Sequence, residues 1–375
     1  MNLAMGKYLL DAAVIRPLVI AIVVIYHAFI IYNGGWEEPI GFQPVKWYGW
    51  IAKFFNTFQM PAIIFVSDYI FGYQQLTLGR FDSLKDIVIK KFKRLVLPSV
   101  FFSLIYFSMF YRWEDYTFLS SVLKILSGVG HLWFLPMLFW CFVVGKILVN
   151  MCFKRSPSQL NQDELGTLNS RCGLEVVISK DVYVWMSFLF LLMISLFPCP
   201  LPFGLGSATR YMVFFWGGFL VWRYHDWIIG KTCNLKYVVL IVSCFLLLFL
   251  LSNYFFIPVS EDQDLIWRLT KYVVNRIVIL PVSISGVCVI YMLTNYVIDK
   301  CRVIPASWVV NAGTICFGVY IYQQFILEVL YYKTSLSQLV GPYWLPWIAC
   351  VVTFVLSIMF SQLTLKTRLG RCLIG

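Results

Sequence analysis

Charged residues are scarce in this chain: only 13% of its 375 residues are Asp, Glu, Lys or Arg. A soluble domain averages about 25% charged residues, so the composition excludes an ordinary soluble protein. The longest polar stretch, residues 154–180, is too short to build a core of its own. We expect one transmembrane domain over residues 1–375, with a mobile cytoplasmic loop at 154–180.

The sequence also lacks the patterns of a metal centre or a disulfide framework. Its 11 cysteines and three histidines form no Cys-x-x-Cys pair and no Cys/His ligand spacing. Most cysteines lie in apolar runs or basic loops, and only Cys199 falls in a loop that is predicted to face outward. We therefore expect no metal and no tightly bound cofactor. The first apolar run should remain as a helix, because it is too long for a cleaved signal and contains Asp11 and Arg16.

Long apolar runs are what the sequence has in abundance, since 60% of its residues are hydrophobic and the mean hydropathy is +0.79. A helix needs roughly 20 residues to cross a bilayer, and lipid offers the backbone no hydrogen-bond partner. The prediction is an all-α polytopic membrane protein with about ten transmembrane helices. The runs lie at residues 8–32, 47–74, 95–112, 129–152, 182–198, 208–229, 237–256, 270–298, 307–332 and 343–364.

Lys and Arg gather in alternate loops, most densely at residues 80–94. Because such loops stay in the cytoplasm, both termini are predicted to be cytoplasmic, in a multi-pass protein of the plasma (inner) membrane. The formal charge of +12 then reflects topology and anionic lipid, so no nucleic-acid partner is expected. Residues 113–127 carry the apolar pattern of an amphipathic helix on the outer surface.

Arg16 and His27 lie eleven residues apart in the first apolar run. Eleven helical steps return to within about 20° of the starting direction and rise roughly 16 Å, so both side chains share one face. Ionisable groups inside a bilayer are costly and usually mark a substrate or ion path. A polar stripe that forms one route through the membrane is therefore predicted.

Other polar residues fall at two depths of the predicted helices. Near the inner side, Arg16 and Asp68 lie at one level beside Lys91, Lys93 and Arg94, whose positive charges could bind phosphates. On the outer side, an imidazole such as that of His27 can remove a proton from a hydroxyl near neutral pH. The arrangement suits transfer from a polyanionic donor inside to a neutral acceptor outside. The predicted acceptor-binding residues are His131, Trp133, Arg210, Arg276 and Glu328.

The segment from Ile15 to His27 resembles the first helix of the acyltransferase 3 family of integral membrane O-acyltransferases, whose hallmark is an Arg and a His separated by ten residues. The order of several further motifs extends the resemblance over residues 8–364. These motifs are Met60–Tyr69, Lys91–Pro98, Gly130–Leu135, Arg210–Gly217 and Gly318–Gln323.

The resemblance implies transfer of an acyl group, expected to be acetyl, from cytoplasmic acyl-CoA to a hydroxyl of an extracytoplasmic or lipid-linked saccharide. It implies a polysaccharide O-acetyltransferase-like enzyme without the extra extracellular hydrolase-like domain. His27 would be the catalytic base or acyl carrier, with Arg16 beside the CoA or the acyl group. The acyl-CoA would be bound by Arg16, Asp68, Lys91 and Arg94.

Three positions depart from the family pattern: Asp68 replaces a Gly, Lys91 replaces an Arg and Gln323 replaces a His. These departures concern the donor and acceptor more than the reaction class. A transporter or flippase could use the same intramembrane charges without covalent chemistry, and a non-catalytic scaffold would need neither Arg16 nor His27. The acceptor sugar, the acyl length and the oligomeric state stay open.

Overall fold

The computed structural model describes residues 2–80, 83–153, 170–258, 264–301 and 307–375, and these residues form helices and no strands. Seven of the helical segments are long and apolar enough to cross a membrane. The predicted all-α polytopic fold is thus confirmed. In chain order the helices are α1 (Asn2–Phe29), α2 (Lys46–Asn56), α3 (Gln59–Gly72), α4 (Leu84–Lys91), α5 (Leu97–Phe110), α6 (Phe118–Ser127), α7 (Phe134–Cys152), α8 (Ser170–Ile194), α9 (Leu205–Arg223), α10 (His225–Thr232), α11 (Leu235–Phe255), α12 (Leu265–Cys301), α13 (Ser307–Glu328), α14 (Leu336–Leu339), α15 (Leu345–Lys366) and α16 (Arg368–Ile374).

Three of the ten predicted runs differ from a simple spanning helix. The run at 47–74 is broken between α2 and α3, and the run at 208–229 is divided between α9 and α10. The run at 182–198 corresponds to the end of α8, whose described apolar part covers only Asp181–Ile194. Of the predicted loop at 154–180, residues 154–169 lie outside the described residues, whereas residues 170–180 belong to α8.

The amphipathic segment forms the short helix α6, and its first two residues, Phe118 and Leu119, are 86% and 67% exposed. Exposed apolar side chains of this kind suit an interfacial helix.

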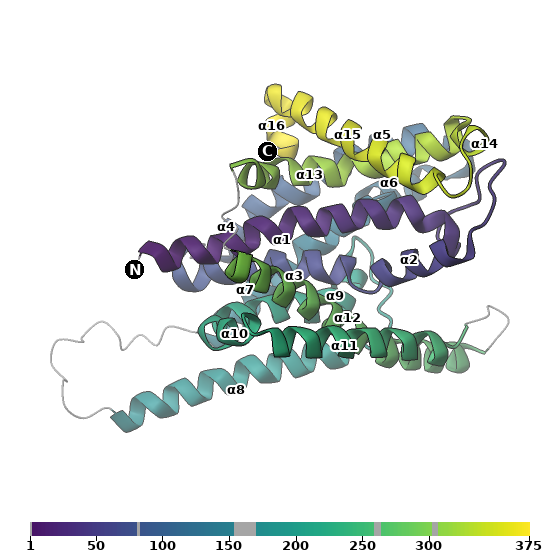
Figure 1. The fold of residues 1–375 in the computed structure, drawn as a ribbon. Helices are drawn as coiled ribbons and strands as arrows, with labels where there is room; N and C mark the ends of the chain where they lie inside the picture. Colours follow the sequence, from purple (N-terminus) through teal and green to yellow (C-terminus); the bar gives the residue numbers. More distant parts are fainter. Residues whose placement is uncertain (1, 81–82, 154–169, 259–263, 302–306) are drawn as a thin grey trace.

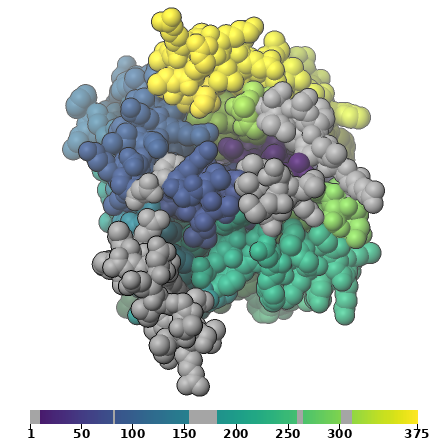
Figure 2. All heavy atoms as spheres, turned by 90° about the vertical axis from the view of Figure 1, so that its left-hand side faces the viewer, coloured from purple at the N-terminus to yellow at the C-terminus, as the bar shows by residue number. Residues whose placement is uncertain are grey.

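The two termini lie toward the same end of the bundle (Figure 1). We call this the inner end, following the predicted orientation, and the opposite end the outer end. Figure 2 looks onto the inner end, where α1 shows in purple only near the centre, with α4 in blue beside it and α16 in yellow above.

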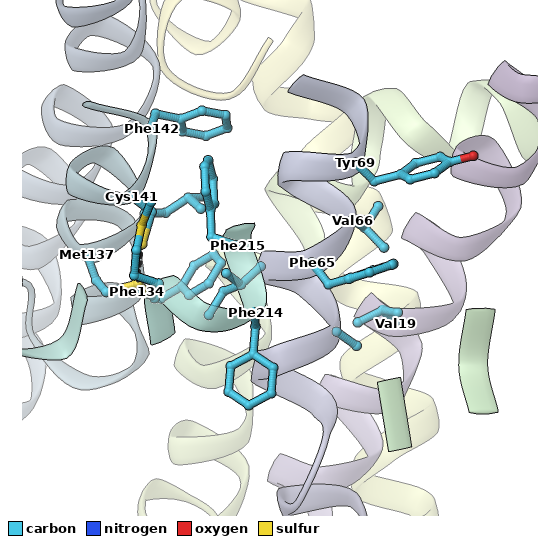
Figure 3. Packing of buried hydrophobic residues seen from close by; sticks show 14 of the residues in the cluster. Val19, Phe65, Val66, Tyr69, Phe134, Met137, Cys141, Phe142, Phe214 and Phe215 are labelled. Carbon is cyan, nitrogen blue, oxygen red and sulfur yellow. Dashed lines mark hydrogen bonds between the residues drawn. The ribbon is translucent and has the colours of Figure 1, made fainter. Parts of the chain in front are cut away.

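The centre of the bundle is built from α1, α3, α7 and α9. Gly218 of α9 lies directly against α3, because a Cβ atom at this position would meet the Phe65 carbonyl oxygen at 2.2 Å. Small residues permit such close helix contact in membrane proteins. One turn earlier on α9, the rings of Phe215 and Phe142 of α7 meet edge to face with their centroids 5.0 Å apart (Figure 3). This packing fixes α3 and α7, which both line the candidate site.

Candidate functional site

Helix α1 carries both Arg16 and His27, and both side chains face the interior, as their spacing predicts. Arg16 lines a cavity inside the bundle, and His27 is only 9% exposed. Leu18, between them in sequence, is 42% exposed and marks the lipid-facing side of the same helix. The polar stripe therefore turns away from lipid.

The hollow at Arg16, which we call the inner cavity, has a volume of about 190 Å³. Arg16 of α1, Lys91 of α4 and Arg94 from the wide helical turn at Phe92–Val96 all line it. No Asp or Glu is among its lining residues. Three cationic side chains without a neighbouring carboxylate on the wall are suited to hold phosphate oxygens through charge-assisted hydrogen bonds. The predicted donor cluster of Arg16, Lys91 and Arg94 is thus brought together.

Local helix geometry explains why Lys91 and Arg94 reach one cavity. Residues three apart lie on the same side of a helix, and the wide π turn continues that side from α4 into α5. The Lys91 Nζ atom lies 3.5 Å from the ring centroid of Phe142, where the ring face attracts the cation.

Asp68, the fourth predicted donor residue, does not line the inner cavity. It is fully buried in α3, and its Oδ2 atom accepts a hydrogen bond of 3.1 Å from the backbone N–H of Phe219 in α9. Asp68 therefore lies behind the wall of the cavity, where it joins α3 to α9. Its neighbour Ser67 faces the cavity instead.

His27 is oriented by its own helix. Its Nδ1 atom lies 2.9 Å from the carbonyl oxygen of Val23, one turn earlier. A carbonyl only accepts hydrogen bonds, so Nδ1 carries the proton in this arrangement and Nε2 is left to accept one. The imidazole also lies 6.0 Å, between ring centroids, from the indole of Trp36.

A second hollow, which we call the outer pocket, has a volume of about 620 Å³ and lies at the other end of α1. Its wall combines aromatic rings with two carboxylates. Aromatic faces and a few placed polar groups are the usual composition of a pocket for a small polar ligand with apolar surfaces, such as a sugar. The lining residues are Gly34, Gly35, Trp36, Glu37, Phe110, Tyr111, Glu328 and Tyr332.

Glu328 is held in the outer pocket by a hydrogen-bond network. The Tyr106 hydroxyl and the Gln324 amide both donate to its Oε1 atom, the latter at 3.0 Å. The same amide donates to the Tyr106 hydroxyl at 2.8 Å. Since both bonds use Oε1, the Oε2 atom is left to accept a hydrogen bond from a ligand hydroxyl.

His131 lies between the two hollows, beside this network. Its Nε2 atom donates to the Ile321 carbonyl at 2.9 Å, and its own carbonyl accepts a bond of 2.5 Å from the Tyr320 hydroxyl. Tyr320 and Phe134 line the outer part of the inner cavity. His27 lines neither the inner cavity nor the outer pocket. The prediction of a single polar route is therefore wrong for the described part of the chain. Two hollows are present instead, with a partition of buried side chains between them.

The predicted outer cluster is divided, because Trp133, Arg210 and Arg276 do not line the outer pocket. The Arg276 guanidinium donates to the Ser195 carbonyl at 3.2 Å and to the Arg210 carbonyl at 3.4 Å, which joins α12 to α9 and to the end of α8. Trp133 packs on Tyr211, next to Arg210, with 5.9 Å between ring centroids. Their positions within the predicted helices placed these residues at a similar depth in the membrane. Depth alone, however, does not say on which side of the bundle a helix lies.

The structure adds two residues that sequence reasoning did not assign to the site, and it also buries Gln323, one of the three departures from the family pattern. Trp36 follows α1 in a loop without a recognisable pattern, and Tyr320 lies inside an apolar motif. Gln323 is fully buried, and neither of its amide atoms has a hydrogen-bond partner in the described chain. Burial of an unpaired amide is costly, and a bound ligand is one way to satisfy it. Within the described residues, no group of His, Cys, Asp or Glu could hold a metal ion.

Comparison with known proteins places this architecture in a family. A family model described as an acyltransferase domain, acyltransferase 3, matches residues 11–365. Neither the curated proteins nor the solved structures gave a match. The matched region contains both hollows and every site residue described above. The chain therefore belongs to the acyltransferase 3 family and is a multi-pass membrane acyltransferase.

Proposed function

We propose that this protein is an O-acetyltransferase that moves an acetyl group from acetyl-CoA on the inner side to a hydroxyl of a saccharide on the outer side. The observation that supports it best is the meeting of Arg16, Lys91 and Arg94 around one small cavity. A cluster of cations at membrane depth is expensive unless an anion is bound there, and CoA carries several phosphates. The proposed location is the plasma membrane.

His27 is the proposed catalytic residue. As a general base, Nε2 takes the proton of the acceptor hydroxyl while the oxygen of that hydroxyl attacks the thioester carbonyl carbon. The carbon–sulfur bond then breaks, and the CoA thiolate leaves and takes up the proton. As a nucleophile, Nε2 would instead carry the acetyl group for one step before the acceptor oxygen displaces it. Both routes need the Nε2 lone pair that the hydrogen bond to Val23 leaves free.

For this reaction the partition must open, because His27 lines neither hollow. On the inner side Tyr320 and Phe134 lie between the cavity and the level of His131. On the outer side Trp36 both lines the pocket and packs on the His27 ring. Rotation of these aromatic side chains would bring the thioester and the acceptor hydroxyl to the imidazole from opposite sides.

The test is transfer of radiolabel from acetyl-CoA to a saccharide acceptor by the purified protein in lipid nanodiscs. Loss of a general base typically lowers the rate by about 10²–10⁴-fold, so His27→Ala should lose transfer by that factor. Leu18→Ala, on the lipid-facing side of the same helix, is the matched control and should keep full activity. Full activity of a folded His27→Ala protein would contradict the proposal. Movement of labelled solute across proteoliposomes without acetyl-CoA would support a transporter instead.

A further inference from the structure

A hollow on the side of the bundle, which we call the lateral groove, has a volume of about 660 Å³ and lies between α5, α13, α15 and α16. Its wall is almost entirely hydrocarbon. Phe101, Ile105 and Met109 follow one another at four-residue spacing on α5 and are 37%, 37% and 50% exposed. Side chains four apart form one stripe along a helix. The groove thus opens sideways, toward the lipid.

A second apolar hollow of about 700 Å³, which we call the control groove, lies against α3, α8, α9, α10 and α12. It includes Trp227 of α10 and Ile284 of α12. The helices α5, α13, α15 and α16 lie together on one side of the bundle, and α8 lies on the opposite side (Figure 1). Size and apolar character therefore do not distinguish the two grooves. They differ in whether they adjoin the outer pocket.

The lateral groove continues into the outer pocket. Met109 lines the groove and the next residue, Phe110, lines the pocket; Val329 lines the groove and the preceding residue, Glu328, lines the pocket. Phe325 of the groove packs on the Tyr106 ring, with centroids 4.9 Å apart, and the hydroxyl of that ring donates to Glu328. The control groove shares no such boundary, since none of its lining residues is adjacent in sequence to one that lines the outer pocket.

We propose that the lateral groove holds the hydrocarbon chain of a lipid-linked saccharide whose sugar lies in the outer pocket. This inference rests on the proposed function and names the form in which the acceptor arrives. The stripe from Phe101 to Met109 spans eight residues, about 12 Å along the helix, which is less than half of the roughly 30 Å hydrocarbon core. The groove therefore binds the part of the chain next to the headgroup.

The benefit of the groove is positioning rather than hydrophobic transfer. A chain that moves from lipid to the groove exchanges one apolar surrounding for another, so burial alone adds little. A chain fixed beside Phe325 holds its headgroup at Glu328, and correct placement of the reacting groups is a large part of catalysis. Lateral entry also means that the acceptor diffuses within the membrane and need not be drawn from the aqueous phase.

The experiment compares two acceptors with the same sugar, one on a long polyprenyl chain and one on a short water-soluble group, in nanodiscs with acetyl-CoA. Ile105→Trp fills the lateral groove, and Ile284→Trp fills the control groove. We expect Ile105→Trp to raise the KM of the polyprenyl acceptor about tenfold, because the sugar is displaced from the reacting position. The KM values of acetyl-CoA and of the short acceptor should stay the same, and Ile284→Trp should change none of them.

A photoreactive group on the polyprenyl chain gives a second readout that does not depend on the fold of a variant. In the wild-type protein it should label peptides from α5 and α15, and peptides from α9 and α12 should stay unlabelled. Equal KM values for both acceptors in the wild type, or labelling of α9 and α12 alone, would overturn the lateral groove while leaving acetyl transfer intact. An absence of transfer to either acceptor by the wild-type protein would contradict the proposed function itself.

Discussion

The inner cavity and the outer pocket differ in both charge and size. The inner cavity carries three cations, has no carboxylate on its wall and has a volume of about 190 Å³. The outer pocket carries two carboxylates and no cation among its lining residues, and its volume is about 620 Å³. One helix, α1, connects them, with Arg16 at the first and Trp36 just beyond its end at the second.

The contrast indicates that the two hollows suit ligands of opposite kinds. Positive side chains that are removed from water attract phosphate strongly, whereas aromatic rings and carboxylates recognise the apolar faces and hydroxyls of a neutral ligand. A variant that disturbs one hollow should therefore change the kinetics of one substrate and spare the other.

Among changes to the lining of the two hollows, the largest effect is expected from Arg16→Ala in the inner cavity. Loss of charge-assisted hydrogen bonds costs about 1.5–3 kcal/mol, so the KM of acetyl-CoA should rise roughly 10–100-fold. The KM of the acceptor should not change. Arg16→Lys keeps the charge but loses the planar fork of the guanidinium group. Its KM for acetyl-CoA should therefore lie between those of the wild type and of Arg16→Ala. Steady-state kinetics with each substrate varied in turn makes the measurement, and an equal rise of both KM values would remove the distinction between the hollows.

Glu328→Gln is the matching change in the outer pocket, and a smaller effect is expected. The substitution keeps the shape and removes the charge, so the hydrogen bond to an acceptor hydroxyl weakens and the KM of the acceptor should rise about tenfold. The KM of acetyl-CoA should stay at its wild-type value. Tyr237→Phe is a suitable control, because this exposed residue of α11 lines neither hollow. A shift in the donor KM instead would mean that Glu328 serves the inner side.

Gln323→Leu tests whether the buried, unpaired amide of α13 takes part in transfer. Leucine of similar volume removes the unpaired amide, so the thermal midpoint in nanodiscs should stay the same or rise. If the amide forms a hydrogen bond to the substrate during transfer, the rate of transfer should nevertheless fall about fivefold. This factor corresponds to the loss of one hydrogen bond of roughly 1 kcal/mol. Unchanged transfer with a raised midpoint would assign Gln323 no part in catalysis.

Added salt should produce the smallest effect and should again separate the two substrates. Mobile ions screen partly exposed charges, and the Debye length falls from about 10 Å at 0.1 M to about 3 Å at 1 M. The KM of acetyl-CoA should therefore rise roughly threefold over that range, while the KM of a neutral acceptor stays constant. Titration of potassium chloride in the same assay checks this, and a salt-dependent acceptor KM would point to charge on the acceptor.

The sequence was sufficient to predict the helical fold and the grouping of Arg16, Lys91 and Arg94 around one site. Long apolar runs and the eleven-residue spacing depend on helix geometry alone, which a sequence states directly. The break within the run at 47–74 was not visible, because apolar composition continues across Thr57 and Phe58 although the helix does not.

The outer side was predicted less well, since its residues are brought together by tertiary packing. Glu328 and Arg276 have similar depths, but Glu328 faces the outer pocket and Arg276 holds backbone carbonyls of α8 and α9. Trp36 could not be found from the sequence, because a single Trp in a loop is indistinguishable from the many aromatic residues at a membrane surface. Asp68 had the right depth for the inner cavity, but its side chain points to α9.

The partition at Tyr320 and Phe134 also bears on the integrity of the membrane that contains the enzyme. An uninterrupted polar channel from Arg16 to the outer pocket would conduct protons and ions and would discharge the gradient across the bilayer. Buried aromatic rings between the hollows keep the resting protein sealed, and each opening to one side can be followed by closure before the other side opens. In the proposed reaction, the acetyl group would thus pass from one compartment to the other without a leak of ions.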